Sequence, residues 1–380
     1  GTLNDFRSEL SVGVTDGELL SAELSGEFAG NESGLTSIDM RVNSFDGRAR
    51  LTGTVQWSPT KQADLNLTGS DLDISPLIGG FATRLEVQLD LTASDTEQFT
   101  VNVRNLEGSY SEQPIRITGT LSRDGDEWRC TSCDAAVGEN RVRADLMLND
   151  RRISGAIDAE APAIHQLHPD FSGMLQAQGT LSGSPRLPIL SGSITARDLV
   201  ANEMAIGSGD IQVTGDLNDI DVTSRWAMQG NSIDLSAQLQ RKEDRITGRI
   251  SRAEIDQVET GSWTLEDPFT FSINPELVTV GESLWSNGDA RLQTGQVVRG
   301  ATTVAAEIEL TGAPLQWFGP YMPDEVAIDG YVDAALILRE DNGNWSGSAE
   351  WRQRDTLLHV KLIDGEVFEV AVPTATAQAR

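Results

Sequence analysis

Apolar and polar residues alternate one by one over long stretches of this sequence. Leu85, Val87 and Leu89 are each separated by a polar residue, and the longest such row runs from 326 to 338. Side chains of successive strand residues point to opposite faces, so this pattern places one apolar row on one face of a sheet. An antiparallel sheet with one face exposed to solvent has this pattern, whereas a buried parallel sheet does not.

The turn signals agree with short strands joined by hairpins. No stretch longer than about ten residues keeps a 3.6-residue period with caps at both ends, which argues against helices. Turn dipeptides that favour two-residue hairpins stand at Asp124-Gly125, Asn287-Gly288, Asn342-Gly343 and Asp364-Gly365. We therefore predict an all-β chain of about two dozen short antiparallel strands.

A glycine recurs in the middle of the predicted strands. A mid-strand glycine costs stability, so its repetition needs a cause. One interpretation is a bend or bulge where the sheet curls, and the other is a face left without side chains to admit a ligand or a second sheet. The sequence leaves both open. The repeated positions are Gly53, Gly119, Gly155, Gly179, Gly215, Gly248 and Gly330.

Three short apolar segments that contain proline interrupt the alternation, at 73–81, 161–171 and 313–323. Each has the length of one helical turn or of a loop that folds over the edge of a sheet. The segment at 313–323 is the most apolar, with Trp317, Phe318 and Tyr321. It is interpreted either as a plug that covers the end of a core or as a gate or contact surface.

No composition shift divides the chain. Neither a Ser/Gly-rich nor a Pro-rich linker interrupts the 380 residues. We therefore expect residues 1–380 to form one continuous elongated segment that grows by adding strands, each touching mainly its neighbours.

The charge balance excludes several classes of partner. The chain carries 58 acidic against 29 basic residues, a net charge of −29. Nucleic acids and anionic membrane surfaces require clustered Lys and Arg, so neither is expected as a partner. A membrane-spanning helix is also not expected, because no run of about 18 apolar residues occurs.

Residues for catalysis are scarce. The three histidines are His165, His168 and His359, and no nucleophile elbow or phosphate-binding glycine loop accompanies them. His165 and His168 lie three residues apart, without the further ligands that a metal site needs. We predict neither an enzyme nor a cofactor or metal site.

Cys130 and Cys133 form the single Cys-x-x-Cys, in WRCTSC. Two cysteines cannot complete a four-thiolate zinc site, and a thioredoxin-type pair needs a helix after the first cysteine. A structural disulfide at a hairpin end is favoured, with reduced thiols or redox chemistry as alternatives. A disulfide would indicate an oxidising compartment.

The arrangement of these strands resembles the TamB family, the large periplasmic component of the translocation and assembly module, related to AsmA-like and bridge-like lipid transfer proteins. The strongest resemblance is at 169–217, which contains GTLSGSPRLPILSGSI and ends in VTGDL. Segments 137–148 and 228–239 resemble the family's Gly-x-Asn strand starts. Segment 315–338 resembles the family's pattern of a Leu-x-Pro segment that leads into a strand with a glycine.

The resemblance implies an elongated, twisted, open β-trough (β-taco) with an apolar inner face. It also implies a periplasmic segment of an inner-membrane-anchored protein of a Gram-negative bacterium. Family members begin with a membrane anchor and end in a characteristic C-terminal module, and neither is evident here, so we interpret the chain as an internal fragment. The TamA-like outer-membrane partner would then be contacted by a part that is not in this chain.

The expected function is a conduit that shields phospholipid acyl chains between the inner and outer membranes. The alternative is an assembly factor that receives outer-membrane β-barrel and autotransporter proteins along a strand edge or in the groove. A third interpretation is a scaffold filled by its own side chains. The residues predicted to line the lipid groove are Leu85, Val87, Leu89, Ile115, Ile117, Leu175, Ile211, Val213, Leu217, Ile233, Leu235, Val326, Ile328, Val332 and Leu336.

Overall fold

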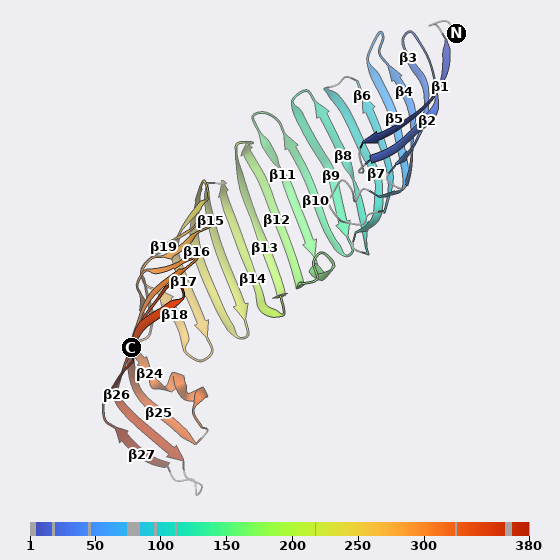
Figure 1. Cartoon of the computed structure of the whole chain (residues 1–380). Coiled ribbons are helices and arrows are strands. Elements are labelled where there is room, and N and C mark those ends of the chain that lie inside the picture. Colours follow the sequence, from blue (N-terminus) through green and yellow to red (C-terminus); the bar gives the residue numbers. More distant parts are fainter. Residues whose placement is uncertain are drawn as a thin grey trace. The chain divides into compact units, whose positions relative to one another are not determined.

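The structure is a computed structural model that describes residues 5–16, 20–44, 47–73, 84–94, 97–110, 112–216, 218–323, 325–361 and 367–379. Within these ranges, 28 strands form one antiparallel sheet (Figure 1). The helical elements among them are two 3₁₀ segments, η1 (Ile164–Gln166) and η2 (Leu315–Tyr321). The all-β class predicted from the alternation is confirmed.

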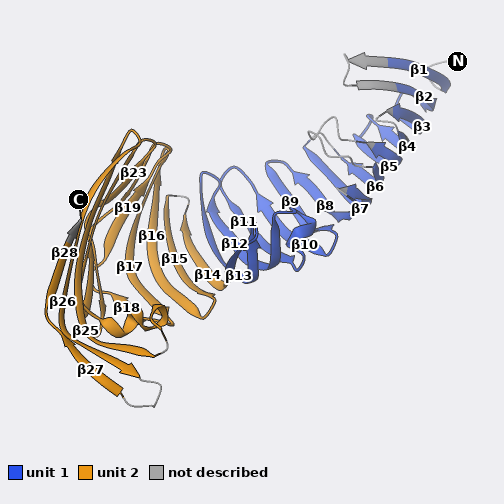
Figure 2. Ribbon diagram, turned by 60° about the horizontal axis from the view of Figure 1, so that its bottom comes forward, with its two compact units in different colours: residues 1–206 blue, residues 207–380 orange. Residues whose placement is uncertain are grey.

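The chain divides into two compact units, residues 1–206 and residues 207–380 (Figure 2). No linker composition marks this division, and strand β14 spans it. A single continuous segment over 1–380 stays a prediction.

Unit 1 is a succession of hairpins in which each strand pairs with the strand before it and the strand after it. The 3₁₀ segment η1 joins its eleventh and twelfth strands. Its strands are β1 (Phe6–Asp16), β2 (Leu20–Asn31), β3 (Gly34–Ser44), β4 (Gly47–Gln56), β5 (Gln62–Asp73), β6 (Arg84–Ala93), β7 (Gln98–Tyr110), β8 (Gln113–Asp124), β9 (Glu127–Val137), β10 (Asn140–Leu148), β11 (Ile153–Ala161), β12 (Phe171–Ser184) and β13 (Leu187–Ala201).

Unit 2 combines long strands with short ones. Six short strands lie between β17 and β24, two more (β27 and β28) follow β26, and η2 follows β24. The strands are β14 (Met204–Asp216), β15 (Asp219–Met228), β16 (Asn231–Lys242), β17 (Arg245–Gln257), β18 (Gly261–Leu265), β19 (Phe269–Ile273), β20 (Leu277–Val280), β21 (Ser283–Asn287), β22 (Ala290–Thr294), β23 (Val297–Gly300), β24 (Thr303–Pro314), β25 (Val326–Asp341), β26 (Asn344–Lys361), β27 (Val367–Val372) and β28 (Ala375–Ala379).

Pairs of these short strands, placed end to end, take the place of single long strands. Strand β17 pairs with β19 through its first half and with β18 through its second half. Strand β24 pairs in the same way with β23 and β22. Breaks at 266–268, 281–282 and 295–296 therefore divide three successive strands, which allows the sheet to bend there.

Glycine in the hairpin turns and strand centres has an identifiable backbone role. Gly125 (φ 59°) and Gly343 (φ 83°) occupy turns that were predicted from Asp-Gly and Asn-Gly, whereas 364–365 lies outside the described residues. Gly53 has φ 145°, and a Cβ atom there would lie 2.0 Å from the Asp64 carbonyl oxygen. Close approach of the neighbouring strand therefore requires glycine at this position, and the two interpretations of the repeated glycine both stay open.

Candidate functional site

The register of unit 1 gathers its apolar side chains on one face of the sheet. Directly paired residues of neighbouring strands point to the same side, so a row can be followed from strand to strand. One row, here called the central row, crosses all thirteen strands. It consists of Ser8, Phe28, Ile38, Gly53, Leu65, Leu91, Val101, Leu121, Cys130, Leu146, Gly155, Leu181 and Leu190.

The opposite face of unit 1 is polar and carries exposed ion pairs. Arg141 donates from Nε to both carboxylate oxygens of Asp134, at 2.9 and 2.7 Å, across the β9–β10 pair. The hydrogen bond from Arg141 holds the pKa of Asp134 below its usual value. A similar pair joins Arg50 to Asp39. Exposed pairs of this kind contribute little stability, about 0–1 kcal/mol each, so this face is a solvated surface.

The apolar face of unit 1 is exposed over much of its area. Leu121, Ile157 and Ile194 keep 39%, 37% and 38% of their surface accessible, although they lie in strand interiors. Leu85 and Val87 are buried, at 4% and 9%. Exposed apolar side chains recur from β8 to β13, and contiguous exposed apolar patches are typical of interaction surfaces.

The predicted groove residues of unit 1 all lie on this apolar face. Leu89 stands opposite Leu67, Ile117 opposite Leu106, and Leu175 opposite Ala196. Leu85, Val87 and Ile115 occupy the same face, near the N-terminal ends of β6 and β8. Whether these side chains contact lipid stays a prediction.

The described predicted residues of unit 2 lie on one apolar face of β14, β16 and β25. Ile211 and Leu235 stand on either side of Ser224, and Ile233 lies opposite Trp226. Val213 pairs with Val222. Leu217 lies outside the described residues. The remaining four residues, Val326, Ile328, Val332 and Leu336, follow one another along β25.

A small core forms under η2, which the alternation alone does not reveal. Ala313, Leu315 and Val332 are 0%, 2% and 1% exposed, and they pack together. Leu336 lies only four residues from Val332 on the same strand, yet it is 41% exposed. Val332 is therefore a core residue beneath η2, whereas Leu336 faces outward from an uncovered part of the same face.

Aromatic contacts fasten η2 across the apolar face of unit 2. Trp317 contacts Trp263 of β18 with ring centroids 5.4 Å apart, and Phe318 contacts Trp351 of β26 at 6.0 Å. The segment predicted at 313–323 thus adopts a 3₁₀ conformation over the sheet. Segment 161–171 contains η1, and most of 73–81 lies outside the described residues.

Asp329 ties η2 to the sheet through polar contacts. Gln316 of η2 donates to Asp329 Oδ1 at 2.6 Å, and His359 Nε2 of β26 lies 2.9 Å from Asp329 Oδ2. These two hydrogen bonds, that from Gln316 first, hold the pKa of Asp329 below its usual value. One carboxylate on β25 therefore links η2 with β26.

Cys130 and Cys133 form a disulfide, with Cα atoms 6.0 Å apart. The bond lies inside β9, at a bulge, and not at a hairpin end as predicted. Cys130 pairs with Leu146 and Cys133 with Ala144, both on the apolar face of β10. Ser132 in the bulge has φ 50°, and its N–H donates to Asp145 Oδ1 at 2.6 Å. The bulge inserts one extra residue between the two cysteines, so both of their side chains point to the same face of the sheet.

Neither a metal site nor a membrane span is found in the part of the chain that the structure describes. No group of three His, Cys, Asp or Glu side chains there is placed to hold a metal ion. The 3₁₀ segments are far too short to span a bilayer, and no other helix occurs in those ranges that could do so.

Comparison with known families decides the identity of the fold. The family model described as TamB, N-terminal domain, matches residues 1–224 and again 193–379. This chain belongs to the TamB family. The resemblance noted in the sequence is thereby confirmed. No solved structure matches the chain.

Membership in the TamB family sets the cellular context at a coarse level. TamB proteins belong to the Gram-negative cell envelope, where they act in the translocation and assembly module of the outer membrane. They work with a TamA-like partner, and the family is one of non-enzymatic bridge or assembly proteins.

Proposed function

We propose that the apolar face of this TamB-family chain carries phospholipid acyl chains through the periplasm between the two membranes. The observation that carries the proposal is the exposure of the central row in unit 1, with Leu121 39% and Leu190 39% accessible. Each methylene removed from water contributes about 0.8 kcal/mol, so an acyl chain laid on this row is held without any specific hydrogen bond.

The uniformity of the row favours movement along the sheet. Nine of the thirteen residues in the central row are Leu, Ile, Val or Phe, so most neighbouring positions offer similar apolar contacts. An acyl chain passing between equivalent positions loses one set of contacts as it gains another, because the hydrophobic effect depends on buried area rather than direction.

The experiment places a photo-crosslinking residue on each face of the same strand. Leu121 on the apolar face of β8 and Val213 of β14 are expected to capture phospholipid in cells, in the full-length protein. The adjacent Ser122 and Gln212 point to the polar face and are expected to capture little. Lipid adducts are identified by mass spectrometry. Equal capture at neighbouring positions would contradict the proposal.

The same experiment addresses the assembly-factor alternative. The family's role in outer-membrane assembly favours it, because an extended, partly apolar β-protein could occupy the same face. In that case Leu121 and Val213 would capture polypeptides of outer-membrane β-proteins instead of lipid, which gel mobility and peptide mass spectrometry separate from lipid adducts.

A further inference from the structure

A cation stands at one edge of the otherwise uncharged apolar face of unit 1. Arg123 pairs with Phe99 and with Trp128, so its side chain belongs to the apolar face. Among the side chains that the structure describes, it is the single charged residue at a paired position on this face. A charge on an apolar face is costly unless it has a partner.

The contacts of Arg123 hold its guanidinium in place without neutralising it. The guanidinium carbon lies 5.3 Å from the centre of the Trp128 ring, and Nε donates to the Gly125 carbonyl at 2.9 Å. Trp128 is in turn held edge-on by Phe99, with ring centroids 5.5 Å apart. No carboxylate within the described ranges forms an ion pair with Arg123, so its two terminal nitrogens can bind an anion.

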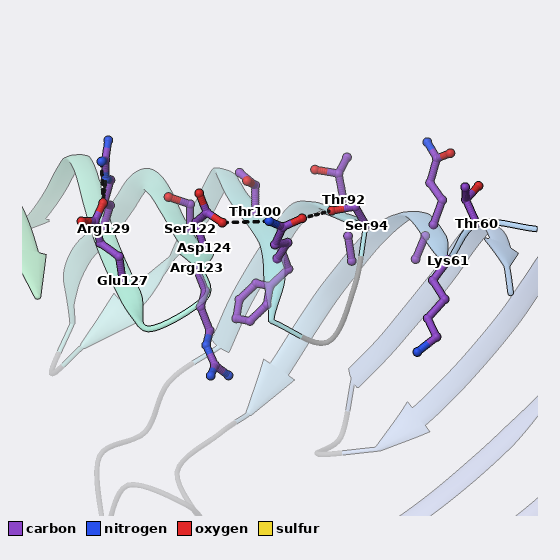
Figure 3. Close-up of a pocket in the computed structure, with 15 residues that line it drawn as sticks. Thr60, Lys61, Thr92, Ser94, Thr100, Ser122, Arg123, Asp124, Glu127 and Arg129 are labelled. Atoms are coloured by element: carbon purple, nitrogen blue, oxygen red, sulfur yellow. Dashed lines mark hydrogen bonds and ion pairs between the residues drawn. The ribbon is translucent and has the colours of Figure 1, made fainter. Parts of the chain in front are cut away.

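A hollow of about 700 Å³ lies at the same edge, and a second cationic side chain lines it. Lys61, in the β4–β5 turn, lines the hollow together with Arg123, and Figure 3 shows both side chains extending to the same side of the ribbon. Lys61 likewise has no ion pair with any described carboxylate.

The carboxylates that line the hollow are already engaged. Asp124 accepts a hydrogen bond from Gln98 Nε2 at 2.9 Å, and Glu127 pairs with Arg129, which extends to the other side of the ribbon (Figure 3). In a chain with a net charge of −29, this edge thus presents two cations that form no ion pair with the described carboxylates beside them.

The order of side chains along β8 reproduces the order of groups at a lipid–water interface. On this face of β8 the apolar residues Ile117 and Leu121 come first and the cation Arg123 follows, with the aromatic rings of Phe99 and Trp128 beside it on β7 and β9, as in the interfacial belts of membrane proteins. One lipid leaflet contributes about 15 Å of hydrocarbon, which corresponds to four or five strand residues. That length extends from Arg123 past Leu121 and Gly119 towards Ile117.

We propose that Lys61 and Arg123 bind the phosphate groups of phospholipids at this edge, with the acyl chains lying along the strands towards Ile115. This inference rests on the proposed function and adds the orientation of the lipid. Strands β5 and β8 are three spacings apart, about 14 Å, so each cation binds its own phosphate.

The test compares two double variants of the full-length protein that lose the same charge. Lys61→Gln/Arg123→Gln removes the two cations of the hollow that form no ion pair with a described carboxylate, and Arg116→Gln/Arg143→Gln removes two cations from the polar face of β8 and β10, outside the hollow. Native mass spectrometry measures binding of dipalmitoyl phosphatidylglycerol, of the matched diacylglycerol and of inorganic phosphate. We expect wild type and the polar-face variant to prefer the phospholipid, and the hollow variant to lose that preference about tenfold while binding diacylglycerol equally.

Each other outcome has a definite meaning. An unchanged preference in the hollow variant would overturn the inference while leaving the conduit intact. Strong binding of inorganic phosphate at Lys61 and Arg123, with no phospholipid preference, would assign the cations to free phosphate and overturn it as well. Failure of every variant, wild type included, to bind either lipid would instead refute the proposed function.

A second measurement tests the orientation directly. A phospholipid with a photoreactive group at the acyl terminus is expected to label β8 near Gly119 and Ile117, and one with the group beside the glycerol is expected to label near Arg123. Peptide mass spectrometry locates the adducts. Reversed labelling would overturn the orientation, even if the lipid itself binds.

Discussion

The apolar face of unit 1 and the part of unit 2 beneath η2 are built from the same alternating pattern, but they are used differently. In unit 1, Leu121 and Ile157 stay more than a third exposed, whereas Val332 in unit 2 is 1% exposed under Leu315. A row of apolar side chains thus becomes an open surface or a core according to whether a non-strand segment folds over it.

The largest expected effect comes from placing a charge on each kind of surface within one strand. Val332→Asp buries an unpaired carboxylate and is expected to destabilise unit 2 by about 3–5 kcal/mol. Leu336→Asp, on the same face of β25, is expected to cost about 1 kcal/mol, because its position is 41% exposed. Urea unfolding followed by tryptophan fluorescence measures both. Equal destabilisation would show that the face near Leu336 is also a closed core.

Removing the aromatic anchor of η2 is expected to have the next largest effect. Trp317→Ala loses the contact with Trp263 and is expected to cost about 2–3 kcal/mol. It also uncovers the face, so a crosslinker at Ile328 is expected to capture more phospholipid than in the parent protein. Tyr321→Ala serves as the control, since Tyr321 is 82% exposed. Unchanged capture at Ile328 would argue that η2 does not restrict access.

The disulfide is expected to affect unit 1 alone. Closing so short a loop stabilises the folded state by about 2 kcal/mol in the chain-entropy account, so Cys130→Ala/Cys133→Ala is expected to lower stability by that amount. Trp57 and Trp128 report on unit 1, and the other six tryptophans lie in unit 2. Thiol titration of the denatured, unreduced protein is expected to find no free thiol. Two free thiols would contradict the bond and its oxidising compartment.

The smallest expected effect is acid sensitivity of the η2 tether. The folded-state pKa of Asp329 is lowered, first by Gln316 and then by His359, so its contribution to stability is present above the unfolded pKa of about 3.9. That contribution is lost as pH falls through the lower folded pKa. Asp329→Asn is therefore expected to remove a fluorescence change of unit 2 below about pH 4.

The matched variant for this titration lies in unit 1. Asp39 also has a lowered pKa, through its hydrogen bond with Arg50, but it stands on the polar face of β3 in unit 1. Asp39→Asn is expected to leave the acid response of unit 2 unchanged. An identical response in both variants would show that the acid transition does not report on η2.

Much of the fold follows from local chemistry. The alternation predicts the strands and assigns each side chain to a face, because successive residues of a strand point in opposite directions. The Asp-Gly and Asn-Gly dipeptides predict the hairpins at 124–125, 287–288 and 342–343, because their backbones tolerate positive φ. The described groove residues accordingly lie on the expected face.

The bulge at Cys130 and Cys133 shows where local pattern ends. The two cysteines are separated by two residues, which as regular strand would place them on opposite faces. The extra residue in β9 brings both to the apolar face opposite β10. Such an insertion depends on the pairing of the neighbouring strand and leaves no distinctive period in the sequence.

Burial and the partners of side chains were decided only by tertiary contacts. Val332 and Leu336 are equivalent in the alternating pattern, and the difference between them comes from Leu315, which reaches Val332 across a chain reversal. Arg123 stands two residues after Leu121, so the alternation already assigns it to the apolar face, and the pairing of strands adds the Trp128 ring against which its guanidinium lies. An alternating sequence specifies which way a side chain points, but burial depends on what packs against it, and that is a property of residues far apart in the chain.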